Sequence, residues 1–275
     1  MSMLPLDIKI VFALRHLRIW HDVYNGSIFL GISGGKASYV LMHLAQVISR
    51  DIDHVFIQNG QILPDDESRV LHILSSRKHV IHRVQTPLAE FYSVQGYPII
   101  SKTVSHRIYA YQTHHAETFN LQDRWMHLLD APFLISDRCC LTFWKHPLKY
   151  VMNDLQKVPV LGSTLQHSPG LYEEYRHHGI LQFDRLIPTA YPFLFWRDKD
   201  FLTYARRYAL PLPPSFQYGW QHTPCVGCGY GIYSRYRRHH FPLLMKTYPN
   251  HADYVMQECG WQSVLRWLAQ YYGEI

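Results

Sequence analysis

Long apolar runs are missing from this chain. None approaches the roughly 20 consecutive residues that a membrane-spanning helix needs. The apolar stretch near the start is interrupted by Asp7, Lys9 and Arg15, which a secretory signal would not tolerate. We therefore expect a protein of the reducing cytosol that has no membrane partner.

Internal repeats and low-complexity tracts are also missing, and charged residues are few. Only 17% of the 275 residues are charged, whereas 47% are hydrophobic, which excludes a disordered chain. The length suits one large domain, or a core domain with a smaller appendage. The net charge of +6 fits an anionic ligand such as a nucleotide, and it fits nucleic acid equally well.

Alternating patterns of predicted strands and helices run through the first half of the chain. The expected helices cover residues 7–24, 39–49 and 65–76, and the expected strands cover residues 27–32, 54–58, 79–84 and 158–162. This order predicts an α/β fold, with a parallel sheet flanked by helices. We expect a nucleotide-binding domain over residues 1–163. Residues 164–275 are expected to pack on it as a mostly helical extension that carries cysteines.

A glycine-rich loop lies between the first expected strand and the second expected helix. The loop residues that can contact a ligand are Ser33, Gly34, Gly35, Lys36 and Ser38. Glycines allow the backbone to approach a ligand closely, and free N–H groups at a helix start attract an anion. The two hydroxyls and the lysine ammonium complete a cradle for phosphate. A tight turn without a ligand is the alternative interpretation.

The loop lacks the spacing of a Walker A motif, but it resembles the PP-loop of the adenine nucleotide alpha-hydrolase superfamily, usually S-G-G-x-x-S. Ala37 replaces an aspartate that is usual in the ATP pyrophosphatase branch and that the sulfonucleotide reductase branch does not require. The resemblance implies a Rossmann-like fold and an adenine nucleotide ligand. It also implies that Asn59 and Gly60, after the second strand, contact the nucleotide; a generic turn is the alternative there.

Four of the five cysteines form two pairs, Cys139 with Cys140 and Cys225 with Cys228. Disulfides are not expected in a reducing compartment, so metal binding, catalysis or an inert role remain. Four thiolates suit a [4Fe–4S] cluster or zinc. Adjacent cysteines reach one small tetrahedral ion only with strain, whereas they can ligate two irons of a larger cube. Unrelated free thiols are the third interpretation.

This arrangement resembles the cluster motif of the adenylylsulfate (APS) reductase branch of the PAPS reductase family. In that branch a lysine and Pro-Leu follow the double cysteine, as Lys145 and Pro147 do here. The resemblance implies a [4Fe–4S] cluster on the four cysteines, with zinc as the alternative metal. It also implies a catalytic role for Lys145.

The fifth cysteine, Cys259, lies in a Glu-Cys-Gly segment that resembles the catalytic cysteine segment of the same family. There the thiolate attacks the sulfur of APS or PAPS, and a thioredoxin-like reductant resolves the product. Trp261 and Gln262 depart from the family pattern, and Gly260 also fits an ordinary helix end. A structural role for Cys259 is therefore the stronger of the two interpretations.

Three classes of function follow. The first is a PAPS reductase-like enzyme of sulfur metabolism that acts in sulfonucleotide reduction or sulfur transfer. The second binds ATP at the same loop and adenylates a nucleic-acid substrate, into which a sulfur donor then inserts sulfur. The third is a nucleotide-sensing module without catalysis. Only the first needs a reactive thiol at Cys259, because only reductive chemistry uses that nucleophile.

Overall fold

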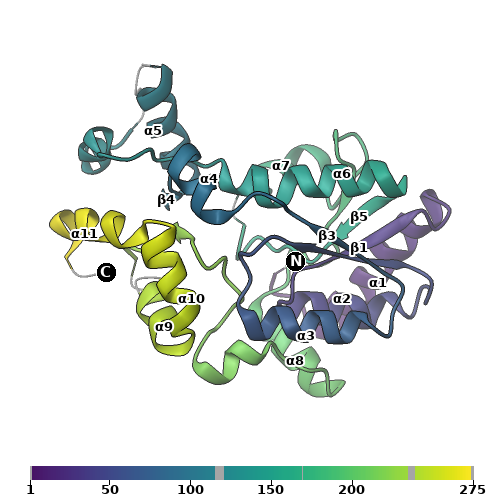
Figure 1. The fold of residues 1–275 in the computed structure, drawn as a ribbon. Coiled ribbons are helices and arrows are strands. Elements are labelled where there is room, and N and C mark those ends of the chain that lie inside the picture. Colours follow the sequence, from purple (N-terminus) through teal and green to yellow (C-terminus); the bar gives the residue numbers. More distant parts are fainter. Residues whose placement is uncertain (1, 115–120, 169, 235–238, 274–275) are drawn as a thin grey trace. The chain divides into compact units, whose positions relative to one another are not determined.

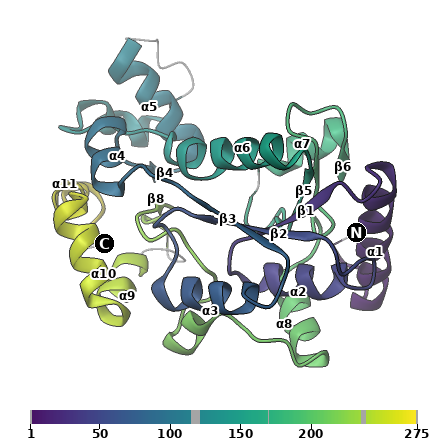
Figure 2. The same cartoon turned by 45° about the vertical axis from the view of Figure 1, so that its right-hand side comes forward.

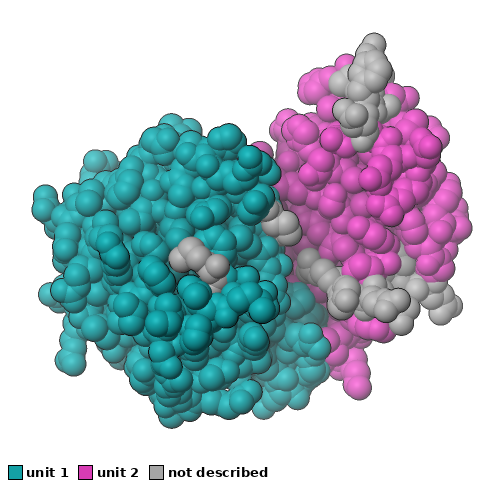
Figure 3. All heavy atoms as spheres, turned by 180° about the vertical axis from the view of Figure 1, so that it is seen from behind, with its two compact units in different colours: residues 1–58, 62–83, 147–223 teal, residues 59–61, 84–146, 224–275 magenta. Residues whose placement is uncertain are grey.

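The computed structural model describes residues 2–114, 121–168, 170–234 and 239–273. The described chain divides into two compact units (Figure 3). Unit 1 comprises residues 1–58, 62–83 and 147–223, and unit 2 comprises residues 59–61, 84–146 and 224–275. The expected boundary between residues 163 and 164 therefore falls inside unit 1. The reason is that strands from both sides of this boundary belong to one sheet.

A six-stranded sheet forms the centre of unit 1, in the order β3-β2-β1-β5-β7-β6 (Figure 1). The strands are β1 (Ile28–Ile32), β2 (Asp53–Gln58), β3 (His79–Arg83), β5 (Val158–Leu161), β6 (Leu181–Gln182) and β7 (Thr189–Ala190). All neighbours pair in parallel except β6 and β7, which are antiparallel. This arrangement confirms the expected α/β class, with one short antiparallel edge that the sequence pattern did not indicate.

Helices cover both faces of this sheet (Figure 2). They are α1 (Leu6–Val23), α2 (Lys36–Ala45), α3 (Pro64–Leu74), α6 (His146–Leu155), α7 (Leu171–His178), α8 (Asp198–Arg207) and the 3-10 helix η3 (Pro214–Tyr218). Phe29 of β1 and Val55 of β2 pack against Val151 of α6 on one face. The views place α2 and α3 on the opposite face. The apolar residues on both faces of the central strands explain why those strands lack strict alternation of apolar and polar residues.

Unit 2 is mostly helical around a two-stranded parallel sheet. Its strands are β4 (Ile99–Ile100) and β8 (Gly229–Tyr230). Its helices are α4 (Leu88–Gln95), α5 (Lys102–His114), η1 (Asp123–Asp130), η2 (Leu141–Lys145), α9 (His240–Thr247), α10 (Pro249–Asp253), η4 (Tyr254–Glu258) and α11 (Trp261–Tyr272). Residues 235–238 of the extension that is expected to be mostly helical lie outside the described residues.

Aromatic packing stabilises the centre of unit 2. Tyr92 and Tyr97 stack with ring centroids 5.3 Å apart, and Trp261 meets both rings edge-on. Fully buried aromatic rings contribute large apolar areas, and edge-to-face contacts add about 1 kcal/mol each. This core lies directly under the segment that contains Cys225 and Cys228, since a Cβ at Gly227 would meet the Tyr92 hydroxyl at 2.3 Å.

No helix of the described residues is both long enough and apolar enough to cross a membrane.

Candidate functional sites

The glycine-rich loop joins β1 to α2 in unit 1, as the sequence predicts. Gly34 has φ +79°, a conformation that side chains rarely adopt, and a Cβ there would also meet Val70 at 3.0 Å. Gly35 is the residue that caps the N-terminus of α2. The helix therefore begins at Lys36, three residues earlier than its apolar pattern indicates, because the loop glycines lead directly into its first turn.

The two loop serines close a small ring of hydrogen bonds. The Ser33 N–H donates to the Ser38 hydroxyl at 2.9 Å, and the two hydroxyl oxygens lie 3.2 Å apart. Within the described residues, no hydrogen bond is formed by the N–H groups of Gly34 and Gly35. Unpaired N–H groups at the start of a helix are a ready anion site, because the helix dipole is positive there.

Lys36 is held beside the loop by an acceptor cluster that sequence reasoning missed. Its Nζ lies 2.7 Å from an Asp198 carboxylate oxygen and donates to the Gln221 carbonyl at 3.0 Å. The ring of Phe216 lies 5.4 Å from the same ammonium. Only 8% of the Lys36 side chain is exposed, so this charge is neutralised inside the protein and is not free in solvent.

Asp198 carries the charge that balances Lys36. Burial raises the pKa of this carboxyl, but hydrogen bonds from Lys36 and His167 outweigh burial and leave the pKa below its usual value. His167 Nε2 lies 2.7 Å from Oδ1 of Asp198, the same oxygen that Lys36 contacts, and the Gln166 amide donates to the other oxygen, Oδ2, at 3.0 Å. Asp198 is thus ionised at neutral pH and neutralises Lys36.

Thr223 lies against the other side of the loop. A Cβ at Gly35 would meet its hydroxyl oxygen at 2.9 Å and the Ser33 hydroxyl at 3.7 Å. The space that only a glycine leaves open is therefore lined by hydroxyl groups, which is the environment an oxyanion needs. No local pattern marks Thr223 in the sequence, because it lies almost 190 positions after the loop.

Unit 2 brings the two predicted cysteine pairs into one neighbourhood. The sulfurs of Cys139 and Cys140 lie 3.9 Å apart. A hydrogen bond to Cys140, burial, and the nearby charges of Cys140, Cys228 and Cys225 all raise the pKa of the Cys139 thiol. Cys225 thus lies near enough to Cys139 to raise the pKa of its thiol, although the two residues are 86 positions apart in the sequence.

Positive charges face the same group of thiols. The hydrogen bond from Cys139, followed by the charges of Lys102 and Lys145, lowers the pKa of Cys140. Lys145 ends the π-helical turn η2 and is exposed, as is Lys102 at the start of α5. The structure thus places Lys145 beside the double cysteine, and Lys102 is a second cation that sequence reasoning did not identify.

Residues 59–61 connect the two cysteine-bearing segments within unit 2. The Asn59 amide donates to the Phe143 carbonyl at 2.9 Å, just after the double cysteine. The Gln61 carbonyl accepts the Val226 N–H at 2.9 Å, inside the C-x-x-C turn. Asn59 also accepts the Gln61 N–H at 3.0 Å, so both ends of its amide have a partner. The side chain expected to contact a nucleotide thus anchors the cysteine segments, and Gly60, at φ +70°, makes the turn between the two anchors.

Two observations test whether the four cysteines suit an iron–sulfur group. Four thiols are the donor set that such clusters use. The Tyr230 hydroxyl is buried beside the thiols and has no hydrogen-bond partner among the described residues. The donor set and the unpartnered hydroxyl fit a sulfur-rich group.

Over the described residues, no set of three or more His, Cys, Asp or Glu side chains is already arranged around a single metal ion.

Cys259 lies at the junction of η4 and α11, and only 2% of it is exposed. Burial raises the pKa of its thiol to about 11. The Tyr97 hydroxyl donates to its carbonyl at 3.0 Å, and Gly260, at φ +74°, begins α11. These features suit a structural residue at a helix junction, because a nucleophilic cysteine needs a lowered pKa and access to substrate.

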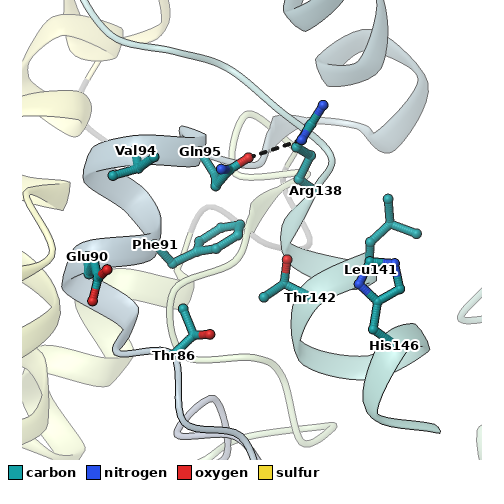
Figure 4. A pocket seen from close by; sticks show the side chains of 9 residues that line it. All are labelled: Thr86, Glu90, Phe91, Val94, Gln95, Arg138, Leu141, Thr142 and His146. Carbon is teal, nitrogen blue, oxygen red and sulfur yellow. Dashed lines mark hydrogen bonds between the residues drawn. The ribbon is translucent and has the colours of Figure 1, made fainter. Parts of the chain in front are cut away.

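A pocket in unit 2 lies beside the double cysteine (Figure 4). It encloses about 320 Å³. One wall comes from α4, where Gln95 accepts a hydrogen bond from Arg138 at 3.3 Å, and the facing wall comes from Leu141 and Thr142. The pocket is thus lined by Arg138 and Leu141, the residues on either side of the double cysteine.

Comparisons with known proteins give likeness in structure and none in sequence. No family model matches the chain, and no curated protein matches it by sequence. The structure is similar to that of phosphoadenylyl-sulfate (PAPS) reductase from Candida auris in complex with phosphate, at 12% sequence identity and a TM-score of 0.46. The match covers 76% of this chain and 85% of that chain.

Proposed function

We propose that this protein is a PAPS reductase-like enzyme that binds an adenine nucleotide at residues 33–38 and a [4Fe–4S] cluster on Cys139, Cys140, Cys225 and Cys228. Its activity belongs to sulfur metabolism, as sulfonucleotide reduction or sulfur transfer. The observation that carries the proposal is the gathering of both cysteine pairs in one unit of a chain that also has a PP-loop-like anion site. Either feature alone is common, whereas their combination is specific.

The nucleotide's phosphate or sulfate would lie on the N–H groups of Gly34 and Gly35, within reach of the Ser33 and Ser38 hydroxyls. Lys36 would exchange part of its contact with Asp198 for the anion. The cluster, when bound, would supply an electron. Lys102 and Lys145 offset the negative charge of four thiolates there.

The buried state of Cys259 favours a second candidate. A thiol with a pKa of about 11 is almost entirely protonated at pH 7, so it cannot act as the nucleophile of reductive chemistry without a rearrangement. In the second candidate the loop binds ATP and the enzyme adenylates a nucleic-acid substrate for sulfur insertion. This reaction makes no demand on Cys259, and it replaces the thioredoxin-like reductant by a sulfur donor.

Nucleotide binding is tested by isothermal titration of ATP, APS and PAPS into the wild type and Gly35→Ala. The added Cβ enters the space beside the Thr223 hydroxyl, so we expect at least a tenfold loss of affinity, about 1.4 kcal/mol. Gly170→Ala is the matched control, because a Cβ there meets nothing within 4 Å. Equal affinity in all three proteins would refute the loop as the nucleotide site.

The reaction class is tested with anaerobically purified protein. Iron and acid-labile sulfide are measured first, with about four irons per chain expected for a cube of this type. The wild type and Cys259→Ser are then assayed with APS and PAPS under a thioredoxin-like reductant. Sulfite release that needs Cys259 assigns a true sulfonucleotide reductase. Cleavage of ATP to AMP and pyrophosphate without sulfite release assigns the adenylating enzyme.

A further inference from the structure

One buried carboxyl of unit 1 lies directly behind the glycine-rich loop. Asp66 is in the first turn of α3, and none of this residue is exposed to solvent. A Cβ at Gly34 would lie 3.6 Å from the Asp66 carbonyl oxygen and 3.9 Å from the Asp66 Cβ. Three acidic residues begin this helix, but Asp65 and Glu67 are partly accessible and Asp66 is buried. An acidic first turn suits the helix dipole without burial, so the dipole does not explain the place of Asp66.

The Asp66 carboxyl is bonded to a segment far along the chain. Its Oδ1 accepts a hydrogen bond from the Ser215 N–H at 3.0 Å. Its Oδ2 has no hydrogen-bond partner among the described residues. Burying a carboxyl is costly unless hydrogen bonds compensate for the lost water, and an apolar side chain would avoid that cost. The bond to Ser215 is therefore better explained by where it holds Ser215 than by the stability that it adds.

The segment that Asp66 holds, residues 214–223, forms one wall of the glycine-rich loop, and we call it the wall segment. Its Gln221 carbonyl accepts a hydrogen bond from Lys36 Nζ at 3.0 Å. At its end, the Thr223 hydroxyl oxygen lies 2.9 Å from the position that a Cβ at Gly35 would take. The wall segment thus supplies a carbonyl and a hydroxyl to the loop, and all of these residues belong to unit 1.

We infer that Asp66 is a positioning residue of the proposed nucleotide site. Its carboxylate holds the wall segment in place, so that Lys36 keeps its carbonyl acceptor and the Thr223 hydroxyl stays beside the loop. This inference rests on the proposed function, because it takes the glycine-rich loop as the nucleotide site. Asp66 itself does not touch the nucleotide, since its side chain is buried behind the loop. Groups that bind a ligand need such support, because a loosely held wall binds the same ligand more weakly.

The test compares the full-length wild type with Asp66→Ala, Asp66→Asn and Asp65→Ala. Asp66→Ala removes the acceptor of the Ser215 N–H, whereas Asp66→Asn keeps an oxygen there and removes only the charge. Asp65→Ala is the matched control, because it removes a charge from the same helical turn and leaves Asp66 intact. Urea unfolding first shows that each protein is fully folded under the assay conditions. Each is then titrated calorimetrically with ATP, APS and PAPS.

We expect Asp66→Ala to bind the nucleotide about tenfold more weakly than the wild type, and the other two variants to bind it within about twofold. Losing a negative charge near an anion would by itself strengthen binding, so a weaker complex identifies the lost acceptor as the cause. Hydrogen exchange followed by mass spectrometry gives the second readout. In Asp66→Ala, amides of the wall segment should exchange faster, while those of β1 and β2 keep their wild-type rates.

Four results overturn the inference. Equal nucleotide affinity in the wild type and Asp66→Ala would refute it and leave the proposed function intact. An equal loss in Asp66→Asn would assign the effect to charge, and faster exchange spread evenly over unit 1 would assign it to general stability. A wild type that binds none of the three nucleotides would refute the nucleotide site and this inference together. Should Asp66→Ala fail to fold, Asp66→Val replaces it, because valine fills the space without an acceptor. Retained affinity in that variant refutes the inference.

Discussion

The glycine-rich loop of unit 1 and the cysteine site of unit 2 are built in opposite ways. The loop takes its serines, glycines and lysine from six consecutive residues, and the strand and helix on either side fix its shape. The cysteine site takes two residues from each of two distant segments and holds them through a third, residues 59–61. A contiguous site depends on local backbone geometry, whereas an assembled site depends on every anchor that joins its segments.

The largest difference between the two regions is expected when one cysteine pair is removed. The double variant Cys225→Ser, Cys228→Ser should lose essentially all iron, because serine oxygens are poor ligands for iron–sulfur clusters. The loop should keep its nucleotide affinity within twofold, since it lies entirely in unit 1. Iron analysis and nucleotide titration on the same preparation check both parts. Iron that stays at the wild-type level would contradict the ligand assignment.

The second-largest effect is expected for Asn59→Ala. This variant decides whether Asn59 contacts the nucleotide or anchors the cysteine segments. Asn59→Ala leaves the Phe143 carbonyl and the Gln61 N–H without their partner inside the protein, at a cost of about 3 kcal/mol. We expect a lower urea midpoint and reduced iron retention, with nucleotide affinity unchanged. A nucleotide affinity that drops tenfold while the midpoint stays constant would restore Asn59 as a nucleotide contact.

Labelling of Cys259 tests whether unit 2 holds a reactive thiol outside the two cysteine pairs. Burial raises the pKa of this thiol from 9.0 to about 11, so its thiolate fraction at pH 7 is about 100-fold below that of an ordinary cysteine. Iodoacetamide should therefore label Cys259 at least 100-fold more slowly than free cysteine at pH 7, and labelling should speed up as the pH rises toward 11. Peptide mapping by mass spectrometry gives the rate. Rapid labelling at neutral pH in folded protein would revive the catalytic interpretation.

The smallest expected effect concerns the charge balance at the loop. Asp198→Asn removes the carboxylate that competes with an anion for Lys36, and we expect nucleotide affinity to rise about threefold, ~0.7 kcal/mol. The same substitution in a Lys36→Met background should have no effect, because the competition acts through Lys36. Titration of the four proteins completes this cycle. Equal gains in both backgrounds would place the effect of Asp198 elsewhere.

The pH dependence of stability tests the same ion pair between Lys36 and Asp198. The pKa of Asp198 is below its usual value because Lys36 and His167 donate to it. Its ion pair therefore stabilises the fold above the ordinary pKa of an aspartate, and that contribution disappears as the pH falls through the lowered value. The stability difference between wild type and Asp198→Asn, followed by urea unfolding, should persist at pH 5 and vanish in strong acid.

Much of unit 1 could be predicted because its signals are local. The apolar runs at β1, β2, β3 and β5 and the amphipathic helices between them are complete within a few residues each. The loop glycines have the same local character, since φ +79° at Gly34 is a property of one residue. The edge strands β6 and β7 escaped prediction, because two residues are too few to show any period.

The sequence by itself determined which atoms are available: a glycine-rich loop before a helix, and two cysteine pairs with a lysine after the first. Only the tertiary structure decided how they are used. It ties Lys36 to Asp198, turns Asn59 toward the cysteine segments, buries Cys259, and leaves the Tyr230 hydroxyl without a partner beside the thiols. The physical reason is that charge pairing, burial and hydrogen bonding are set by neighbours in space. For these four residues, the neighbours that matter come mainly from segments distant in the chain.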